Sequence, residues 1–349
     1  ISLALGPVAG LGAARLVSSH YSIMVKRVSQ IFVAGPPLVE KIGEKVSKEE
    51  LGGSEVHGSN GVIDDVAEDE AEAMEMAKSF LSFMPSSIHN LPKKEITKDD
   101  PLRKDDFLLS IIPKSKRESY DILPIIKSVV DKNSFFELGK KYGLSVITGL
   151  ARLDGFPIIV LANNPQVYGG GWTTNSCKKI IKIIDLAQVF HFPVLNFVDN
   201  PGFIIGKNAE KDGTIKYGAK ALAAMYQFKN PMCSVILRKV FGVAGAAHTN
   251  HMNFKFRFAW PSADTGSLPF EGGIEAAYKS EISQSKDPEK FIRDKHVKLN
   301  SLTSPFRTAE KFLLENVIDP RDTRKEACIW IRLAYKKLKT GPSSFGYRP

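Results

Sequence analysis

The sequence has little of what marks secreted, metal-binding or membrane-spanning proteins. Its 349 residues include three cysteines, Cys177, Cys233 and Cys328, and no Cys-X-X-Cys pair, so we expect neither a disulfide framework nor a zinc ribbon. No apolar run reaches the roughly 18 residues of a membrane-spanning helix. A Walker A motif, a Gly-X-Ser-X-Gly elbow and a dinucleotide-binding glycine motif are also missing, which removes common nucleotide and hydrolase signatures.

What is present is an ordinary globular composition with excess positive charge. Hydrophobic residues make up 43% and charged residues 25% of the chain, and the length suits about two domains. The net charge is +10, but the basic residues are scattered rather than gathered into a stripe with aromatics, which argues against nucleic acid. We expect a soluble α/β protein of a reducing compartment, with no nucleic-acid or membrane partner.

Two short landmarks recur in the same order along the chain. Val8-Ala9-Gly10 returns as Val243-Ala244-Gly245, 235 residues later. Residues 61–64, Gly-Val-Ile-Asp, resemble residues 316–319, Asn-Val-Ile-Asp, 255 residues later. The shared order predicts two related domains.

The repeat also gives the expected domain boundaries. Residues 1–90 are predicted to be the C-terminal part of a first domain, residues 91–117 a linker rich in proline and charge, and residues 118–349 a second domain. The second copy has far more chain before its Val-Ala-Gly landmark than the first, so the repeat predicts that the first domain lacks roughly 115 residues at its start.

Within the second copy, short apolar segments alternate with amphipathic ones. Residues 145–153 and 157–162 are predicted strands joined by a hairpin at Asp154-Gly155. A helix capped by Thr173, Thr174 or Asn175 and a strand over 193–198 follow. The pattern continues with a helix around 219–226 and a strand over 232–237, and it predicts a sheet flanked by helices.

The loop at residues 238–248, rich in Gly and Ala, follows a predicted strand and leads toward a helix. Small side chains there let a ligand approach backbone N–H groups at a helix N-terminus, where negative charge is stabilised. Residues 6–14 have the same character. Close helix packing also requires small residues, and the sequence leaves both interpretations open. Two such loops would supply the pair of anion sites needed to join two carbonyl-type partners.

Four further side chains are interpreted as structural. The spacing of His248 and His251 suits a metal, but no neighbouring ligand completes a set, so we interpret both as polar surface histidines. Ser176 and Lys179 match a Ser-X-X-Lys motif, yet they lie in the first turn of a predicted amphipathic helix without the accompanying motifs.

Two segments are also interpreted as structural. Gly169-Gly170-Gly171 indicates a turn with close backbone approach, and the acidic run at residues 64–75 is typical of a solvated helix face. No side chain emerges as a nucleophile or base. This absence favours chemistry in which backbone amides stabilise oxyanions and a cofactor supplies the reactivity.

Six short motifs form a spaced set along the chain: Ala34-Gly-Pro-Pro37, Glu50-Leu-Gly-Gly-Ser54 with His57, Gly149-Leu-Ala-Arg-Leu-Asp-Gly155, Asp199-Asn-Pro-Gly-Phe203, Arg238-Lys239 with the loop after it, and Ala259-Trp-Pro261. With this set the sequence resembles the carboxyltransferase (β) subunits of biotin-dependent acyl-CoA carboxylases. The resemblance implies tandem crotonase-like α/β domains, each a ββα spiral, assembled as a homo-oligomer that is a trimer of dimers.

The resemblance also implies residue roles. The backbone N–H groups of Gly10 and Leu11 would hold the thioester oxygen of acyl-CoA, and those of Val243 and Ala244 the ureido oxygen of biotin. The binding residues implied on the biotin side are Phe241, Gly242 and Gly170. In the family's mechanism carboxybiotin releases CO₂, the ureido nitrogen removes the α-proton of the acyl-CoA, and the enolate captures the CO₂.

The implied partners are a biotin carboxylase and a biotin carboxyl carrier, with each active site between the N-terminal domain of one subunit and the C-terminal domain of its partner. The implied location is the mitochondrial matrix or a bacterial cytoplasm. Two alternatives stay open: the soluble subunit of an acyl-CoA decarboxylase, which runs the same half-reaction backwards, and a non-catalytic or truncated structural paralogue, because the segment predicted to be missing would form much of the CoA floor.

The chain departs from the family pattern at three places. Leu11-Gly12 follow Ala9-Gly10 where many members read Ala-Gly-Gly-Ala, Ala246 stands where propionyl-type enzymes often have Asp, and residues 262–269 differ from the usual pattern. These departures predict a non-standard acyl group.

Overall fold

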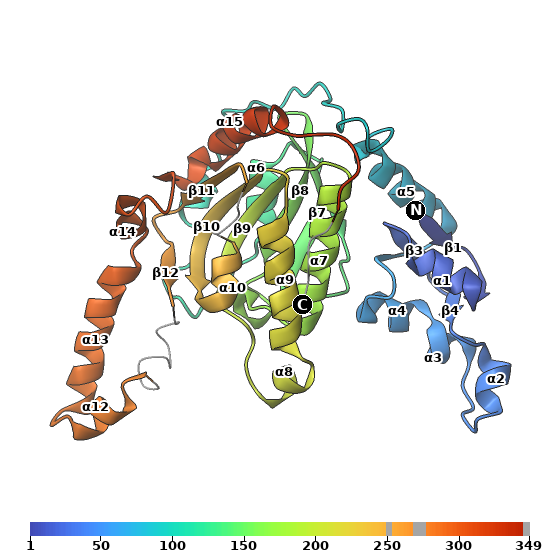
Figure 1. Ribbon diagram of the computed structural model, residues 1–349, viewed down its shortest axis with the longest axis horizontal. Coiled ribbons are helices and arrows are strands. Elements are labelled where there is room, and N and C mark those ends of the chain that lie inside the picture. The colour runs from blue at the N-terminus through green and yellow to red at the C-terminus, as the bar shows by residue number, and fades with distance from the viewer. Residues whose placement is uncertain (249–252, 268–276, 345–349) are drawn as a thin grey trace.

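The computed structural model describes residues 1–248, 253–267 and 277–344, and an eight-stranded sheet forms its centre (Figure 1). The strand order is β13 (Asn316–Val317), β11 (Lys255–Ala259), β10 (Met232–Phe241), β9 (Val194–Asn200), β8 (Phe156–Asn163), β7 (Val146–Leu153) and β6 (Phe136–Leu138), with β12 (Asp264–Gly266) pairing with β10 off this path. The pairs among β6, β7 and β8 are antiparallel and the others are parallel.

Helices cover both faces of this sheet. On one face lie α7 (Thr174–Val189) and α9 (Thr214–Gln227), and on the other α6 (Leu123–Val129) and α15 (Thr323–Tyr335) (Figure 1). Ile159 on β8 belongs to the core on the α7 side and Val160 to the core on the α15 side, as the two-residue period of a strand requires. The other elements of this half are α8 (Lys207–Lys211), α10 (Gly242–Ala247), α12 (Lys279–Gln284), α13 (Pro288–Thr303), α14 (Pro305–Glu310), and the 3₁₀ turns η1 (Asp106–Leu109), η2 (Tyr168–Gly170) and η3 (Pro320–Asp322).

The strands and helices predicted for the second copy are confirmed, with most strands longer than expected. Asp154 and Gly155 join β7 to β8 with φ of 51° and 79°, and positive φ at both positions defines the hairpin turn whose twist matches the strands. Thr173 caps α7: its hydroxyl accepts from the Ser176 N–H, and the Ser176 hydroxyl accepts from the Thr173 N–H. Ser176 of the Ser-X-X-Lys match is therefore part of a capping box.

The N-terminal part lies beside the α7 face (Figure 1). It consists of β1 (Ser2–Ala4), β2 (Pro7–Ala9), α1 (Leu11–Val17), β3 (Ser22–Val25), β4 (Gln30–Phe32), α2 (Pro36–Glu40), α3 (Lys48–Gly52), α4 (Ser54–Asn60), β5 (Asp65–Ala67) and α5 (Glu70–Phe83). β1, β3 and β5 form a parallel sheet, and β2 pairs with β4. Ile23 and Phe80 share one apolar core with Leu150 and Ile180 of the second half, so the two halves pack on each other directly.

Strand pairing supports the repeat and corrects its alignment. The pairing of β1 with β3 is equivalent to the pairing of the start of β10 with β11. The pairing of β2 with β4 is equivalent to the pairing of the end of β10 with β12. The left-handed glycines that follow these strands are Gly10, with φ of 59°, and Gly242, with φ of 62°. The equivalent positions are therefore 232 residues apart, and the Val-Ala-Gly match is wrong by three residues. Likewise, Asn316 pairs with β11 in the way that Asp65 pairs with β3, so the equivalent of Asn316 is Asp65 and not Gly61.

Asp65 links the N-terminal sheet to the second half of the chain. Its carboxylate accepts hydrogen bonds from the N–H groups of Gly139 and Lys140, both at 3.2 Å, and from the Tyr21 hydroxyl at 3.0 Å. Burial is the main reason that the pKa of Asp65 is raised to about 6. The prediction of a solvated acidic face is wrong for this residue, whereas Glu70 and the other glutamates of α5 are exposed.

Replacing Asp65 with Asn should flatten part of the pH dependence of stability. Because the folded-state pKa is raised, the contribution of Asp65 is complete below its ordinary pKa of 3.8 and is lost as the pH rises through about 6. The Asn variant should match the wild type near pH 4 and exceed it by about 2–3 kcal/mol at pH 7. Urea unfolding at several pH values measures this difference. A variant that is instead less stable at pH 7 than at pH 4, relative to wild type, contradicts the assignment.

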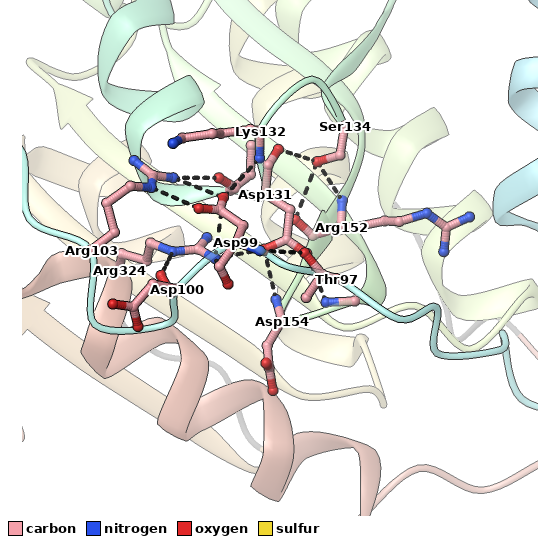
Figure 2. Close-up of polar contacts among 12 residues, drawn as sticks. Thr97, Asp99, Asp100, Arg103, Asp131, Lys132, Ser134, Arg152, Asp154 and Arg324 are labelled. Atoms are coloured by element: carbon pink, nitrogen blue, oxygen red, sulfur yellow. Dashed lines mark hydrogen bonds and ion pairs between the residues drawn. The ribbon is translucent and has the colours of Figure 1, made fainter.

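The predicted linker, residues 91–117, is fastened to the second half of the chain. Figure 2 shows Arg103 and Arg324 converging on Asp99. The Nε of Arg103 lies 2.9 Å from Asp99 Oδ1, and the Nη2 of Arg324 lies 2.8 Å from Asp131 Oδ1 and 3.4 Å from Asp99 Oδ2. Since Arg324 belongs to α15, this network ties the segment to the sheet and to the last helix. The exact domain boundaries stay a prediction.

Candidate functional site

The C-terminal amide loop, residues 241–247, turns from β10 into α10. Phe241 is extended and Gly242 has a φ of +62°, a conformation that favours glycine. The first N–H groups of a helix have no partner within it, and in the described part of the chain those of Val243 and Ala244 donate to no protein acceptor. The Val243 side chain is 58% exposed and Ala244 is buried. The loop thus carries unpaired N–H donors next to an exposed side chain.

Close packing also accounts for part of this loop. A Cβ on Gly245 would lie 2.9 Å from the carbonyl carbon of Val240, so α10 approaches β10 closely only because Gly245 lacks a side chain. Both interpretations left open by the sequence therefore apply, at different residues. Gly245 serves packing, and Gly242 serves the turn that aims the N–H groups outward.

The N-terminal amide loop, residues 9–14, has the same geometry. Gly10 precedes α1 with a φ of +59°, and the Leu11 side chain is 68% exposed. The N–H of Gly10 donates to the Phe32 carbonyl at 3.3 Å, whereas those of Leu11 and Gly12 have no acceptor in the part of the chain that the structure describes. By strand pairing, Leu11 corresponds to Val243. Of the two donors predicted here, Leu11 is open and Gly10 is engaged.

A cavity of about 720 Å³ opens beside the C-terminal amide loop. Gly242, Val243 and Ala246 line it, and its lining also includes Ile236, Val240, Arg257, Thr265, Leu302, Arg307, Thr308, Lys311 and Leu314. Arg257 pairs with Glu315 at 3.2 Å, while Arg307 on α14 and Lys311, the C-cap of α14, have no ion-pair partner among the described residues. The cavity therefore combines an apolar wall with cations and suits a ligand that has an apolar part and an anionic group.

A buried ion pair supports the strand that carries this loop. The Nε of Arg238 lies 3.0 Å from Asp199 Oδ2, and Asp199 Oδ1 accepts from the Lys239 N–H at 3.0 Å. The Tyr120 hydroxyl donates to Asp199 at 2.9 Å. Burial and the neighbouring carboxylate raise the pKa of Tyr120 far above its ordinary value, so it remains a donor. Sequence reasoning identified Asp199 and Arg238 only as motif residues and missed Tyr120, which has no local signal.

Gly170 packs against β9 and does not line the cavity beside Val243. A Cβ there would lie 2.3 Å from the Asp199 carbonyl oxygen, and its φ is +84°. Its own carbonyl accepts from Asn163 Nδ2 at 2.9 Å. The predicted turn with close backbone approach is confirmed, and packing alone explains the glycine. A direct role for Gly170 in binding biotin stays a prediction.

The interpretation of His248 as a surface residue is wrong. Its side chain is 2% exposed, at the end of α10, and His251 lies outside the described residues. No group of three metal-ligating side chains occurs in the described ranges. Lys179 is also buried: its Nζ donates to the carbonyls of Gly139 and Val146, and burial lowers its pKa to about 8.

One chain does not bring the two amide loops together. In Figure 1, α1 lies on the right and α10 on the left of α9, with the α7 face of the sheet between them. Neither loop faces the other within the chain. A site that uses both loops at once requires a second copy of the chain.

The fold and these loops define a class of protein. It is an α/β chain with tandem crotonase-like domains, as predicted, in which two equivalent turns each place backbone N–H donors at a helix start. Sequence comparison identifies the family: the chain matches the carboxyl transferase domain over residues 1–346 and belongs to that family.

Three individual proteins illustrate the similarity. The carboxyltransferase subunit of propionyl-CoA carboxylase from Haloferax mediterranei is 31% identical, with 98% of this chain and 67% of that protein covered. The methylmalonyl-CoA decarboxylase subunit alpha of Veillonella parvula is 31% identical over 100% and 68%. The hexameric transcarboxylase 12S, solved with methylmalonyl-CoA and methylmalonic acid bound, has a TM-score of 0.91 at 29% identity, over 99% and 67%. The chain thus spans about two thirds of these proteins' lengths.

Proposed function

We propose that the chain is a carboxyltransferase subunit that moves a carboxyl group between biotin and the α-carbon of an acyl-CoA. The observation that carries this proposal is the matched pair of turns at Gly10 and Gly242, whose φ angles differ by three degrees, 59° against 62°. Each turn is followed by an exposed position, Leu11 or Val243, with an unpaired N–H. Family membership supports the same chemistry.

Biotin carried on a partner would supply CO₂ and a ureido nitrogen able to take up the α-proton of the acyl-CoA. The N–H groups of Val243 and Ala244 would hold the ureido oxygen of biotin and stabilise negative charge there. The N–H groups of the N-terminal amide loop, Leu11 foremost, stabilise the enolate oxygen that forms from the thioester. The enolate carbon then forms the new bond to CO₂. Each N–H donor of this kind contributes roughly 10²–10³ in rate.

The partners follow from this chemistry. Because the two amide loops lie apart within one chain, the working form is a homo-oligomer in which the N-terminal loop of one copy faces the C-terminal loop of another, and we propose a trimer of dimers. A biotin carboxyl carrier and a biotin carboxylase would deliver the carboxyl group. No helix in the described ranges is long and apolar enough to cross a membrane. The mitochondrial matrix or a bacterial cytoplasm is the proposed location.

Carboxyl transfer from radiolabelled carboxybiotin to a panel of acetyl-, propionyl- and longer acyl-CoA tests this function, with the native protein and the partners that it carries. We expect transfer that requires both biotin and acyl-CoA. Ala246, which lines the cavity beside Val243, replaces the Asp that propionyl-type members often carry, so an acyl group other than propionyl should be preferred. Preference for propionyl-CoA would contradict the non-standard acyl group but not the transfer itself.

A second function, carboxyl removal, is favoured by the similarity to the Veillonella subunit. The same donors would stabilise the enolate left when the carboxyl group of an acyl-CoA passes to biotin. The direction is decided by the partners: a membrane-bound complex that releases CO₂ indicates the decarboxylase, and a complex with biotin carboxylase indicates the carboxylase.

A further inference from the structure

His248 lies at the junction between the C-terminal amide loop and the strands beneath it. It is the C-cap residue of α10 and is 2% exposed. The edge of its ring meets Trp172, with ring centroids 5.1 Å apart. Burial lowers its pKa to about 3, so the imidazole is neutral and carries one ring proton.

Three neighbours bind both ring nitrogens and the backbone carbonyl of this residue. The side-chain amide of Asn200 lies 3.0 Å from Nε2, and that of Asn196 lies 3.0 Å from Nδ1. The Ser234 hydroxyl donates to the backbone carbonyl of His248 at 2.8 Å. Asn196 and Asn200 belong to β9 and Ser234 to β10, so a single side chain joins α10 to two central strands.

The hydrogen bonds determine the ring tautomer. Asn200 Oδ1 accepts from the Gly202 N–H at 2.8 Å, so its Nδ2 faces His248 and Nε2 must be the acceptor. The ring proton is therefore on Nδ1, and its acceptor is the amide oxygen of Asn196. That oxygen is buried and has no partner when it faces away from the ring. Turning it toward Nδ1 satisfies the ring proton and gives up the 3.2 Å hydrogen bond from Asn196 Nδ2 to the Ser234 hydroxyl.

The hydrogen bonds of His248 also hold the segments next to the amide donors, namely α10 and the turn at Gly202. α10 has only six residues, three of them alanine and two glycine, and a helix this short has little stability of its own. Its position depends on packing and on its two ends. Asn200 also holds the turn at Gly202, whose carbonyl accepts from the Trp172 N–H at 3.0 Å.

We propose that His248 is a positioning residue: as the neutral Nδ1–H tautomer it fastens the end of α10 to Asn196 and Asn200 of β9, and thereby fixes the direction of the Val243 and Ala244 N–H groups. The anchoring of α10 by His248 does not depend on any enzyme activity, whereas its effect on catalysis rests on the proposed function. A displacement of about 1 Å in such donors costs up to 10²-fold in rate.

The first test needs no substrate. Ring-nitrogen NMR shifts of His248 in the full chain should show a protonated Nδ1 and an unprotonated Nε2, unchanged between pH 5 and 8. A protonated Nε2, or a titration in this range, overturns the tautomer. Amide hydrogen exchange should be faster in α10 of a His248→Leu variant than in wild type, while α7 is unchanged. Equal protection of α10 in both proteins overturns the anchoring.

The second test separates positioning from stability. His248→Leu should lower kcat for carboxyl transfer about 10- to 100-fold with KM for acyl-CoA within twofold. His248→Gln, which keeps one donor and one acceptor, should recover part of kcat. Cys328→Ala, a buried change on α15, controls for lost stability and should keep kcat per folded molecule. If His248→Leu behaves like Cys328→Ala, the positioning role is wrong. If wild type shows no transfer, the proposed function fails and the exchange result still decides the anchoring.

Discussion

Replacing Val243 with proline should lower carboxyl transfer about 100- to 1000-fold, because proline removes the N–H donor itself. The position is the second residue of α10, after Gly242. Proline suits the first turn of a helix, where its fixed φ is favourable and its missing N–H breaks no helical hydrogen bond. Turnover by the native complex measures the loss, and thermal unfolding confirms that the variant folds.

Val243→Ala is the matched control. It removes the same exposed side chain but keeps the N–H, so turnover should remain within a fewfold of wild type. Leu11→Pro and Leu11→Ala form the corresponding pair in the N-terminal amide loop, where Leu11 is the first residue of α1. Equal activity of the proline and alanine variants at either position would show that its N–H does not take part in the reaction.

Arg324→Met should destabilise the protein by about 3–5 kcal/mol, since it leaves buried carboxylates without their cation. Arg324 is 2% exposed. Its Nη2 bonds Asp131 at 2.8 Å, its Nη1 bonds the Val129 carbonyl at 2.8 Å and its Nε bonds the Asp100 carbonyl at 2.8 Å (Figure 2). Methionine fills similar space but satisfies none of these acceptors.

Arg332→Met is the control for this change on the same helix. The Arg332 side chain is 50% exposed and pairs with Asp154 at 2.7 Å, so its loss should cost less than about 1 kcal/mol. Urea unfolding of both variants gives the comparison. If both cost the same small amount, the buried network of Figure 2 does not hold residues 99–103 to α15.

Local pattern was sufficient to predict most of the second half. The β-branched run before Asp154-Gly155 and the apolar run after it predict the hairpin, and Thr173, one of three candidate caps, marks the start of α7. The order of the repeat was also visible. Its alignment was not, because Val-Ala-Gly is short enough to recur by chance, and only the strand partners show that Gly10 corresponds to Gly242.

Burial of single polar residues could not be predicted in the same way. His248 stands among small and polar residues, and its partners Asn196 and Asn200 precede it by 52 and 48 positions. Asp65 lies in an acidic run whose glutamates are exposed, and its donors Gly139 and Lys140 belong to the other half of the chain. In both cases the tertiary contact overrides the local pattern. The amide loops themselves were found from composition, but their open donors required the backbone geometry.

The most direct test of the account is transfer of a radiolabelled carboxyl group from methylmalonyl-CoA, or another carboxylated acyl-CoA, to free biotin by the native protein. The account predicts label in biotin that depends on the enzyme and falls at least 100-fold in Val243→Pro. Undiminished transfer in that variant, or folded wild-type protein that moves no label to biotin from any acyl-CoA, would contradict it.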